Sequence, residues 1–188
     1  MVPHRDIDVT WHSISLLFKN QPAEDSDYYG PVKTTHGHLR VMEAIRAAAD
    51  SPEAGNSDVF KLYWELGSRI HHDGERDFDI ADALSAVGLD TSFASAADDE
   101  QWDPVIRAAM DDGLGLVGED VGTPIIAMNN SSGERVGYFG PVITKIPRGD
   151  DALKMWDALT AMMDIDGFFE LKKTRTTGPD FGPRPDPV

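Results

Sequence analysis

The 188-residue sequence contains no cysteine, which excludes disulfide bonds, thiolate nucleophiles and cysteine-ligated metal sites within these residues. Positive charge is also scarce, with 33 acidic against 17 basic residues and a formal net charge of −16. Such a surface repels nucleic-acid phosphates and anionic membranes, so we expect neither as a partner. No apolar run approaches the roughly 20 residues of a membrane-spanning helix, and no signal-peptide core follows the first residues. We therefore expect a soluble, cytoplasmic protein of ordinary domain size.

The clearest local pattern is a hairpin. The step Thr123-Pro124 leads directly into a short β-branched run that ends at Met128, and proline suits only the first position or the edge of a strand. The turn-forming cluster Asn129–Gly133 follows, after which Arg135–Gly140 reads as a returning strand. The sequence therefore predicts a β-hairpin entered through the Thr123-Pro124 bond. Because only about one X-Pro bond in twenty is cis, the local pattern by itself favours a trans proline at the start of a strand, unless more of the chain agrees with a cis bond.

The rest of the chain is predicted to be mainly helical. Asp6–Leu16 alternates apolar and polar residues with a period of two, which predicts a half-buried strand. A polar loop from Asn20 to Gly30 follows, carrying Tyr28 and Tyr29 near its end. Apolar periodicity and capping residues then predict helices over 36–49, from a cap at Ser57 to His71, over 79–87, in a short turn capped by Thr91, over 102–117 and over 150–163.

The histidines and acidic runs give no metal-binding spacing. His71 and His72 are adjacent, so they cannot form the i,i+4 pair of a helical zinc site, and no acidic residue stands at ligand spacing from His36 or His38. The acidic runs lack the glycine and terminal glutamate of a calcium loop. His12 could hydrogen-bond near a site, but a half-buried structural histidine is the simpler interpretation. We predict no metal.

Five separated strings resemble the actinobacterial mycothiol-dependent nitroreductase family. They occur in the family's order, and the similarity extends from about residue 5 to residue 181: Arg5–Val9, Glu119–Pro124, Phe139–Val142, Lys145–Gly149 and Phe168–Thr176. The resemblance implies a DsbA-like thioredoxin fold of the α/β class. It also implies an incomplete thioredoxin-like core over 5–35 and 118–177, an inserted helical subdomain over 36–117 and a proline-rich tail over 178–188.

Members of that family begin with a strand and a helix that carry Cys-Pro-Trp-Cys, and these residues are missing here. In the family the first cysteine is the nucleophile and mycothiol is the thiol co-substrate, so no catalytic residue can be assigned in this chain. Either an upstream segment supplies the cysteines, or the protein has lost them and only binds. Because the missing strand would lie between Asp8–Leu16 and the Thr-Pro strand, we expect the isolated chain to be poorly stable, to re-pair its strands or to oligomerise, for example as a homodimer.

The resemblance also suggests where a substrate would bind. In thioredoxin-like proteins, the residue before the proline offers its backbone to an extended thiol, which points to Gly122, Thr123 and Pro124. Asn20, Tyr28 and Tyr29 lie in the loop that the family uses near its pocket, where a tyrosine could stack on a nitro-aromatic ring. The implied function is a thiol-disulfide oxidoreductase acting on nitro-aromatic compounds or disulfides, with no bound cofactor. The alternative is a non-catalytic DsbA-like module that binds thiols or peptides.

Overall fold

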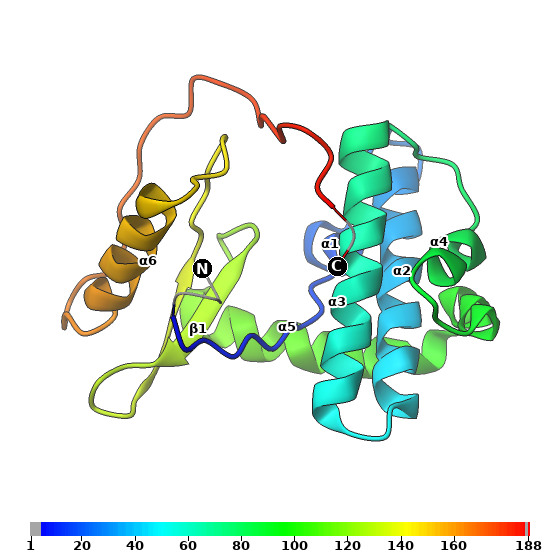
Figure 1. Ribbon diagram of the computed structural model, residues 1–188, viewed down its shortest axis with the longest axis horizontal. Coiled ribbons are helices and arrows are strands. Elements are labelled where there is room, and N and C mark those ends of the chain that lie inside the picture. Colours follow the sequence, from blue (N-terminus) through cyan, green and yellow to red (C-terminus); the bar gives the residue numbers. More distant parts are fainter. Residues whose placement is uncertain (1–4, 187) are drawn as a thin grey trace. The chain divides into compact units, whose positions relative to one another are not determined.

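The computed structural model describes residues 5–186 and residue 188, which form two compact units (Figure 1). The helical unit contains residues 10–111 together with the described residues after 182. The hairpin unit contains residues 5–9 and 112–182. The assignment of a thioredoxin-like core and a helical insertion stays a prediction.

The helical unit is organised around two long helices, α2 and α3, which lie side by side (Figure 1). Its core is a cluster of aliphatic side chains that includes Leu62 and Leu84, both without exposed surface. Full burial of such a side chain contributes about 1.5–3 kcal/mol. In chain order the elements are α1 (Leu16–Asn20), α2 (Tyr29–Ala48), α3 (Pro52–Ser68), the π-helix η2 (Arg69–Asp73), α4 (Ile80–Ala86), the 3₁₀ helices η3 (Thr91–Asp98) and η4 (Glu100–Trp102), and the first part of α5 (Asp103–Val117).

Two helices begin earlier than the sequence predicted. α3 begins at Pro52, where the hydroxyl of Ser51 accepts a hydrogen bond from the Ala54 amide, so the predicted cap at Ser57 is wrong. Proline fits the first helical position because its missing N–H would have had no partner there. α2 likewise begins at Tyr29 rather than at His36, which leaves a shorter loop before it.

The predicted strand over Asp6–Leu16 is wrong, because the structure has no strand there and α1 begins at Leu16. Burial does alternate from Thr10 to Ser15, but the fully buried side chains are those of Ser13 and Ser15, and Val9 is 40% exposed. In the helical unit, this extended segment satisfies its backbone through side chains instead of a neighbouring strand. The Trp11 amide donates to Asn56 Oδ1, and its carbonyl accepts from Arg46 Nη2.

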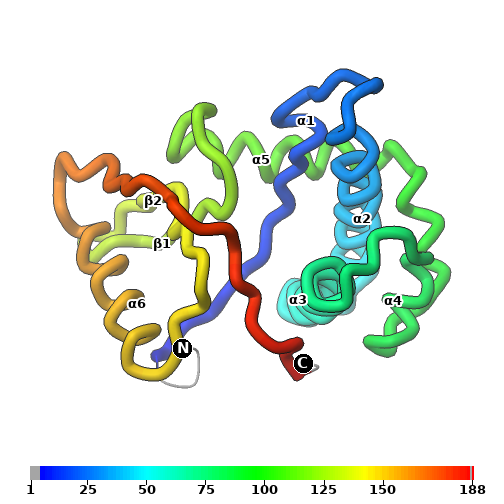
Figure 2. Tube along the Cα trace, turned by 90° about the horizontal axis from the view of Figure 1, so that it is seen from above, coloured from blue at the N-terminus to red at the C-terminus, as the bar shows by residue number. Residues whose placement is uncertain are grey.

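The hairpin unit confirms the predicted hairpin and the last helix. β1 (Ile125–Asn129) pairs antiparallel with β2 (Arg135–Phe139), and α6 (Asp150–Met162) lies beside them (Figure 2). The side-chain oxygen of Asn130 closes the turn, since it accepts hydrogen bonds from the amides of Ser132 and Glu134. Gly133 follows with φ 83°, a conformation that favours glycine.

The two faces of the hairpin have different neighbours within this unit. On one face, a Cβ added to Gly137 would lie 2.9 Å from side-chain carbons of Leu116 in α5. Arg135 on the same face makes two 2.6 Å hydrogen bonds to Asp112. On the other face, the Tyr138 hydroxyl donates to the carbonyl of Phe168. Position 137 therefore needs glycine because the helix approaches the strand so closely.

His38 makes the stability of the helical unit depend on pH. Its ring is buried and stacks on Phe78 with 5.9 Å between centroids, and burial lowers its pKa to about 4. The unfolded chain binds a proton near pH 6.5, whereas the folded chain resists protonation down to about pH 4. His38 therefore makes its full contribution to the free energy of unfolding above pH 6.5, the pKa of the histidine in the unfolded chain. This contribution is lost as the pH falls towards about 4.

We expect the free energy of unfolding to fall as the pH is lowered from 7 to 4.5, by up to about 1.4 kcal/mol per pH unit for this one group. Urea unfolding followed by helical circular dichroism at several pH values measures this slope. His38→Phe should make the slope shallower, because it removes the titrating group. An unchanged slope in the His38 variant would contradict the assignment.

Candidate functional site

The predicted Thr123-Pro124 element lies at the entrance to β1 in the hairpin unit. Both Thr123 and Pro124 are exposed, and the Thr123-Pro124 peptide bond is cis, as is Gly140-Pro141. The carbonyl of Pro124 accepts a 2.8 Å hydrogen bond from the Gly140 amide, which ties the two Pro-containing steps together. Gly122 is half-buried, and a Cβ there would touch the ring of Phe139 at 3.5 Å. These residues form a solvent-accessible stretch of backbone held in place by the hairpin.

The other predicted residues lie at the end of α1 and at the start of α2 in the helical unit. The side-chain amide of Asn20 donates a 3.1 Å hydrogen bond from Nδ2 to the Tyr28 hydroxyl, and Tyr28 is 43% exposed. Tyr29 is half-buried as the first residue of α2, with the Lys33 ammonium 5.8 Å from its ring centroid. Asn20 and Tyr28 therefore form a pair with an accessible aromatic face. Joint action of this pair with Thr123-Pro124, which belongs to the other unit, stays a prediction.

A buried polar network is centred on His36, and no pattern in the sequence indicated it. Its Nδ1 lies 2.9 Å from the hydroxyl of Ser15, and its Nε2 lies 3.1 Å from Asp103 Oδ1. Arg40 donates to both oxygens of Asp103, at 2.7 and 2.9 Å. His36 was expected to have no acidic partner nearby in the sequence. The partner is 67 residues away, and no sequence spacing could have revealed it.

Burial and charge fix the protonation states in this network. Burial is the largest cause of the lowered pKa of His36, although Asp103 opposes it. The Arg40 hydrogen bonds keep the pKa of Asp103 below its ordinary value. A neutral His36 then satisfies both neighbours, because one ring nitrogen donates to the carboxylate and the other accepts from the Ser15 hydroxyl.

The row of Ser15, His36 and Asp103 has the residue types of a hydrolytic triad, but its surroundings indicate a structural role. A nucleophilic serine must meet its substrate, whereas Ser15 has no exposed surface. Its hydroxyl also caps α1 by accepting from the Phe18 amide, and Asp103 is held by Arg40. The network therefore joins α1, α2 and α5 within the helical unit.

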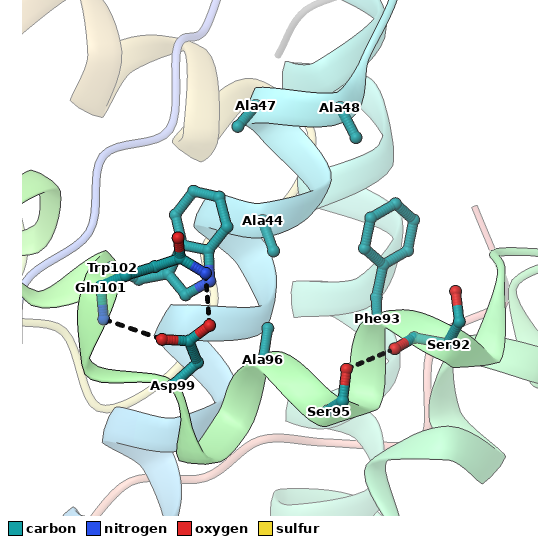
Figure 3. Close-up of a pocket in the computed structure, with 10 residues that line it drawn as sticks. All are labelled: Ala44, Ala47, Ala48, Ser92, Phe93, Ser95, Ala96, Asp99, Gln101 and Trp102. Atoms are coloured by element: carbon teal, nitrogen blue, oxygen red, sulfur yellow. Dashed lines mark hydrogen bonds between the residues drawn. The ribbon is translucent and has the colours of Figure 1, made fainter.

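A hollow of about 370 Å³ lies between α2 and η3 in the same unit (Figure 3). Small alanines of α2 form one wall, and Phe93 and Trp102 contribute aromatic rings. Asp99 is the only acid among the lining residues, and its carboxylate is already engaged by the backbone and side-chain amides of Gln101. None of the predicted site residues lines this hollow, and no lining side chain is placed for acid-base or nucleophilic chemistry.

The remaining candidates are dispersed. His12 is exposed and lies on no strand, contrary to its predicted position. His71 and His72 fall in η2. Over the residues that the structure describes, no group of three or more histidines, aspartates or glutamates is arranged to hold a metal ion. Nor does any helix in those ranges combine the length and apolarity needed to cross a lipid bilayer.

Asp103→Asn should destabilise the helical unit by about 2–4 kcal/mol, because it leaves the partly buried Arg40 without its counter-charge. Asp112→Asn is the matched control, since its pair with Arg135 is about half exposed on both sides, and such pairs are worth less than about 1 kcal/mol. Urea unfolding followed by circular dichroism compares the two variants. Equal effects would mean that the Arg40–Asp103 pair contributes no more to the free energy of unfolding than the exposed Arg135–Asp112 pair does.

The sequence matches one family along most of its length. Residues 2–173 match the family described as Rv2466c-like, mycothiol-dependent nitroreductase Rv2466c. The match covers the hairpin with Thr123-Pro124, the segment with Asn20 and Tyr28, and the helices between them. On this evidence the chain belongs to the Rv2466c-like family of mycothiol-dependent nitroreductases.

Proposed function

We propose that this chain is the substrate-binding part of a cytoplasmic thiol-disulfide oxidoreductase with a DsbA-like thioredoxin fold. Its substrates are nitro-aromatic compounds or disulfides, and mycothiol is its thiol co-substrate. The family match is the observation that carries the proposal. The absence of cysteine from all 188 residues means that every reacting thiol comes from mycothiol or from a polypeptide segment outside these residues.

The electron balance is simple for a disulfide substrate. Two mycothiol thiols are oxidised to one mycothiol disulfide, releasing two electrons and two protons, and these reduce the substrate disulfide to two thiols. A nitro group takes two electrons and two protons to become a nitroso group with loss of water. In both cases the residues proposed below only bind and orient, because none of them can form a disulfide.

Thr123 and Pro124 are proposed to hold the thiol co-substrate. Their exposure and their position at the start of a strand support this role. An extended ligand gains affinity there from backbone hydrogen bonds, as in strand addition. Asn20, Tyr28 and Tyr29 are proposed to contact the aromatic substrate. The exposed Tyr28 ring supports this role, because an aromatic face can stack on an electron-poor nitro-aromatic ring.

The alternative function is a non-catalytic module that binds thiols or peptides through the same backbone. It predicts the same binding, but no reduction of substrate even when the cysteine-bearing motif of the family is supplied. A fusion that places a Cys-Pro-Trp-Cys strand and helix before residue 5 therefore separates the two functions. Mycothiol-dependent nitro reduction by the fusion supports the enzyme, whereas binding without turnover supports the module.

We expect mycothiol disulfide to bind the full chain in isothermal titration calorimetry and to lose at least about tenfold in affinity in Thr123→Pro, because this substitution removes the backbone N–H. Thr123→Ser retains the N–H and is the matched control.

We also expect no reduction of nitrobenzene above the uncatalysed rate when mycothiol is added to the chain alone. Turnover by these residues would refute the proposed origin of the thiol.

Tyr28→Ala should weaken binding of nitrobenzene by about fivefold, since one aromatic contact contributes about 1 kcal/mol. Tyr28→Phe keeps the ring but loses the hydroxyl that accepts from Asn20, so its affinity should stay near that of the unsubstituted chain. Ligand-observed NMR titration measures both variants. Equal affinity of all three proteins would remove Tyr28 from the site.

A further inference from the structure

The C-terminal segment, residues 183–188, belongs to the helical unit and lies beside α3 (Figure 1 and Figure 2). The indole Nε1 of Trp64 donates a 3.1 Å hydrogen bond to the carbonyl of Asp186. The Arg184 guanidinium lies 3.5 Å from Glu65 Oε2 and also pairs with Asp73, the last residue of η2. Three side chains therefore hold the segment, and together they form the Trp64 site: Trp64, Glu65 and Asp73.

The sequence of the C-terminal segment favours an extended backbone. Prolines stand at positions 183, 185 and 187. Proline fixes its own φ at about −65° and keeps the preceding residue out of the helical region, so Arg184 and Asp186 are both biased towards an extended conformation. Such a segment loses little conformational entropy when it docks, which is why proline-rich segments are common ligands of aromatic grooves. Pro185, between the two anchoring residues, is half-buried, whereas Arg184 and Asp186 are exposed.

Aromatic packing fixes the indole that meets this segment. Trp64 packs on Phe60 with 5.7 Å between ring centroids, and Phe60 stacks on Trp11 at 5.3 Å. Tyr63 stacks on the same Trp11 at 5.6 Å. Tryptophan supplies an apolar face and one N–H donor but no acceptor. This chemistry suits a proline-rich segment, because prolines offer apolar rings and carbonyl acceptors but no N–H.

The two carboxylates of the Trp64 site favour a positively charged side chain. The Glu65 side chain is 15% exposed and that of Asp73 is 29% exposed, so both are partly shielded from water. Arg69 donates a 2.7 Å hydrogen bond to Glu65 Oε1, which leaves Oε2 towards Arg184. A guanidinium carries five N–H donors in a planar fork. One arginine can therefore contact both carboxylates at the same time.

We propose that the Trp64 site is a docking site for proline-rich segments in which arginine precedes proline, and that the C-terminal segment of the same chain occupies it as an internal ligand. The step Arg184-Pro185-Asp186 supplies the guanidinium, the proline ring and the carbonyl. A segment of another protein with this chemistry binds when it displaces the internal one. The proposal is independent of the thiol chemistry proposed above, and residues 183–188 lie beyond those that match the family.

The contacts indicate that the internal ligand can be displaced. The Arg184 side chain is 44% exposed, and ion pairs at such positions are weak because water and salt screen them. Attachment to the same chain favours docking, but it raises the effective concentration of a segment only to about the millimolar range that short flexible linkers give. A free peptide of the same chemistry therefore competes at about millimolar concentration.

A fluorescent label on the C-terminal segment tests the docking. Because the sequence contains no cysteine, Val188→Cys supplies one thiol for bimane, a dye that tryptophan quenches on contact. We expect the bimane to be quenched and Trp64→Phe to relieve the quenching. Arg184→Gln should weaken docking about fivefold, because it loses both carboxylate contacts. Arg175→Gln is the matched control, since Arg175 is exposed and lies outside the segment. An unquenched label, or equal quenching in Arg184→Gln and Arg175→Gln, would overturn the proposal.

Competition by a free peptide tests the ligand class while the Trp64 site stays unchanged. The peptide of residues 182–188 should relieve the quenching in the labelled chain at about millimolar concentration. The same peptide with Arg184→Gln should need about fivefold more. No relief at about 10 mM of the unsubstituted peptide would overturn the ligand class. Quenching that grows with the protein concentration would mean that the segment of a second copy occupies the site, and it would overturn the internal docking.

Discussion

The two hydrogen bonds between Arg40 and Asp103 are the interaction on which the helical unit most depends. Asp103 is the first residue of α5, and Arg40 lies in the middle of α2. The same carboxylate forms a hydrogen bond with His36, and His36 in turn orients the Ser15 hydroxyl that caps α1. Three helices, of which α5 is far from the other two in the sequence, thus share one set of charges. Satisfied polar networks of this kind favour one packing arrangement over others.

Local patterns could be predicted where local chemistry decides the structure. The hairpin follows from β-branched residues around an Asn-rich turn, and Asn130 closes that turn as the composition suggested. α6 begins where two aspartates favour a helix N-terminus. Both elements depend on residues within a few positions of each other, which is the range that a sequence pattern reports.

The wrong strand and the missed network both involve partners that lie far away in the sequence. The alternation over residues 6–16 fits a strand, but a strand exists only when another strand accepts its hydrogen bonds. Here the backbone of Trp11 forms hydrogen bonds with the side chains of Asn56 and Arg46 instead. The missed network has the same cause, because 67 residues separate His36 from Asp103. Of the candidate site, the position of Thr123-Pro124 at the start of a strand was predictable, whereas the accessible pairing of Asn20 with Tyr28 depended on the fold.

The close approach of Leu116 to Gly137 has a consequence for how this sequence can vary. A half-exposed strand position ordinarily accepts many residues, and β-branched ones best. At position 137 even one methyl group would meet side-chain carbons at 2.9 Å. Sequence design of this scaffold must therefore keep glycine there or shorten residue 116 at the same time. Position 137 is therefore free to change only together with position 116.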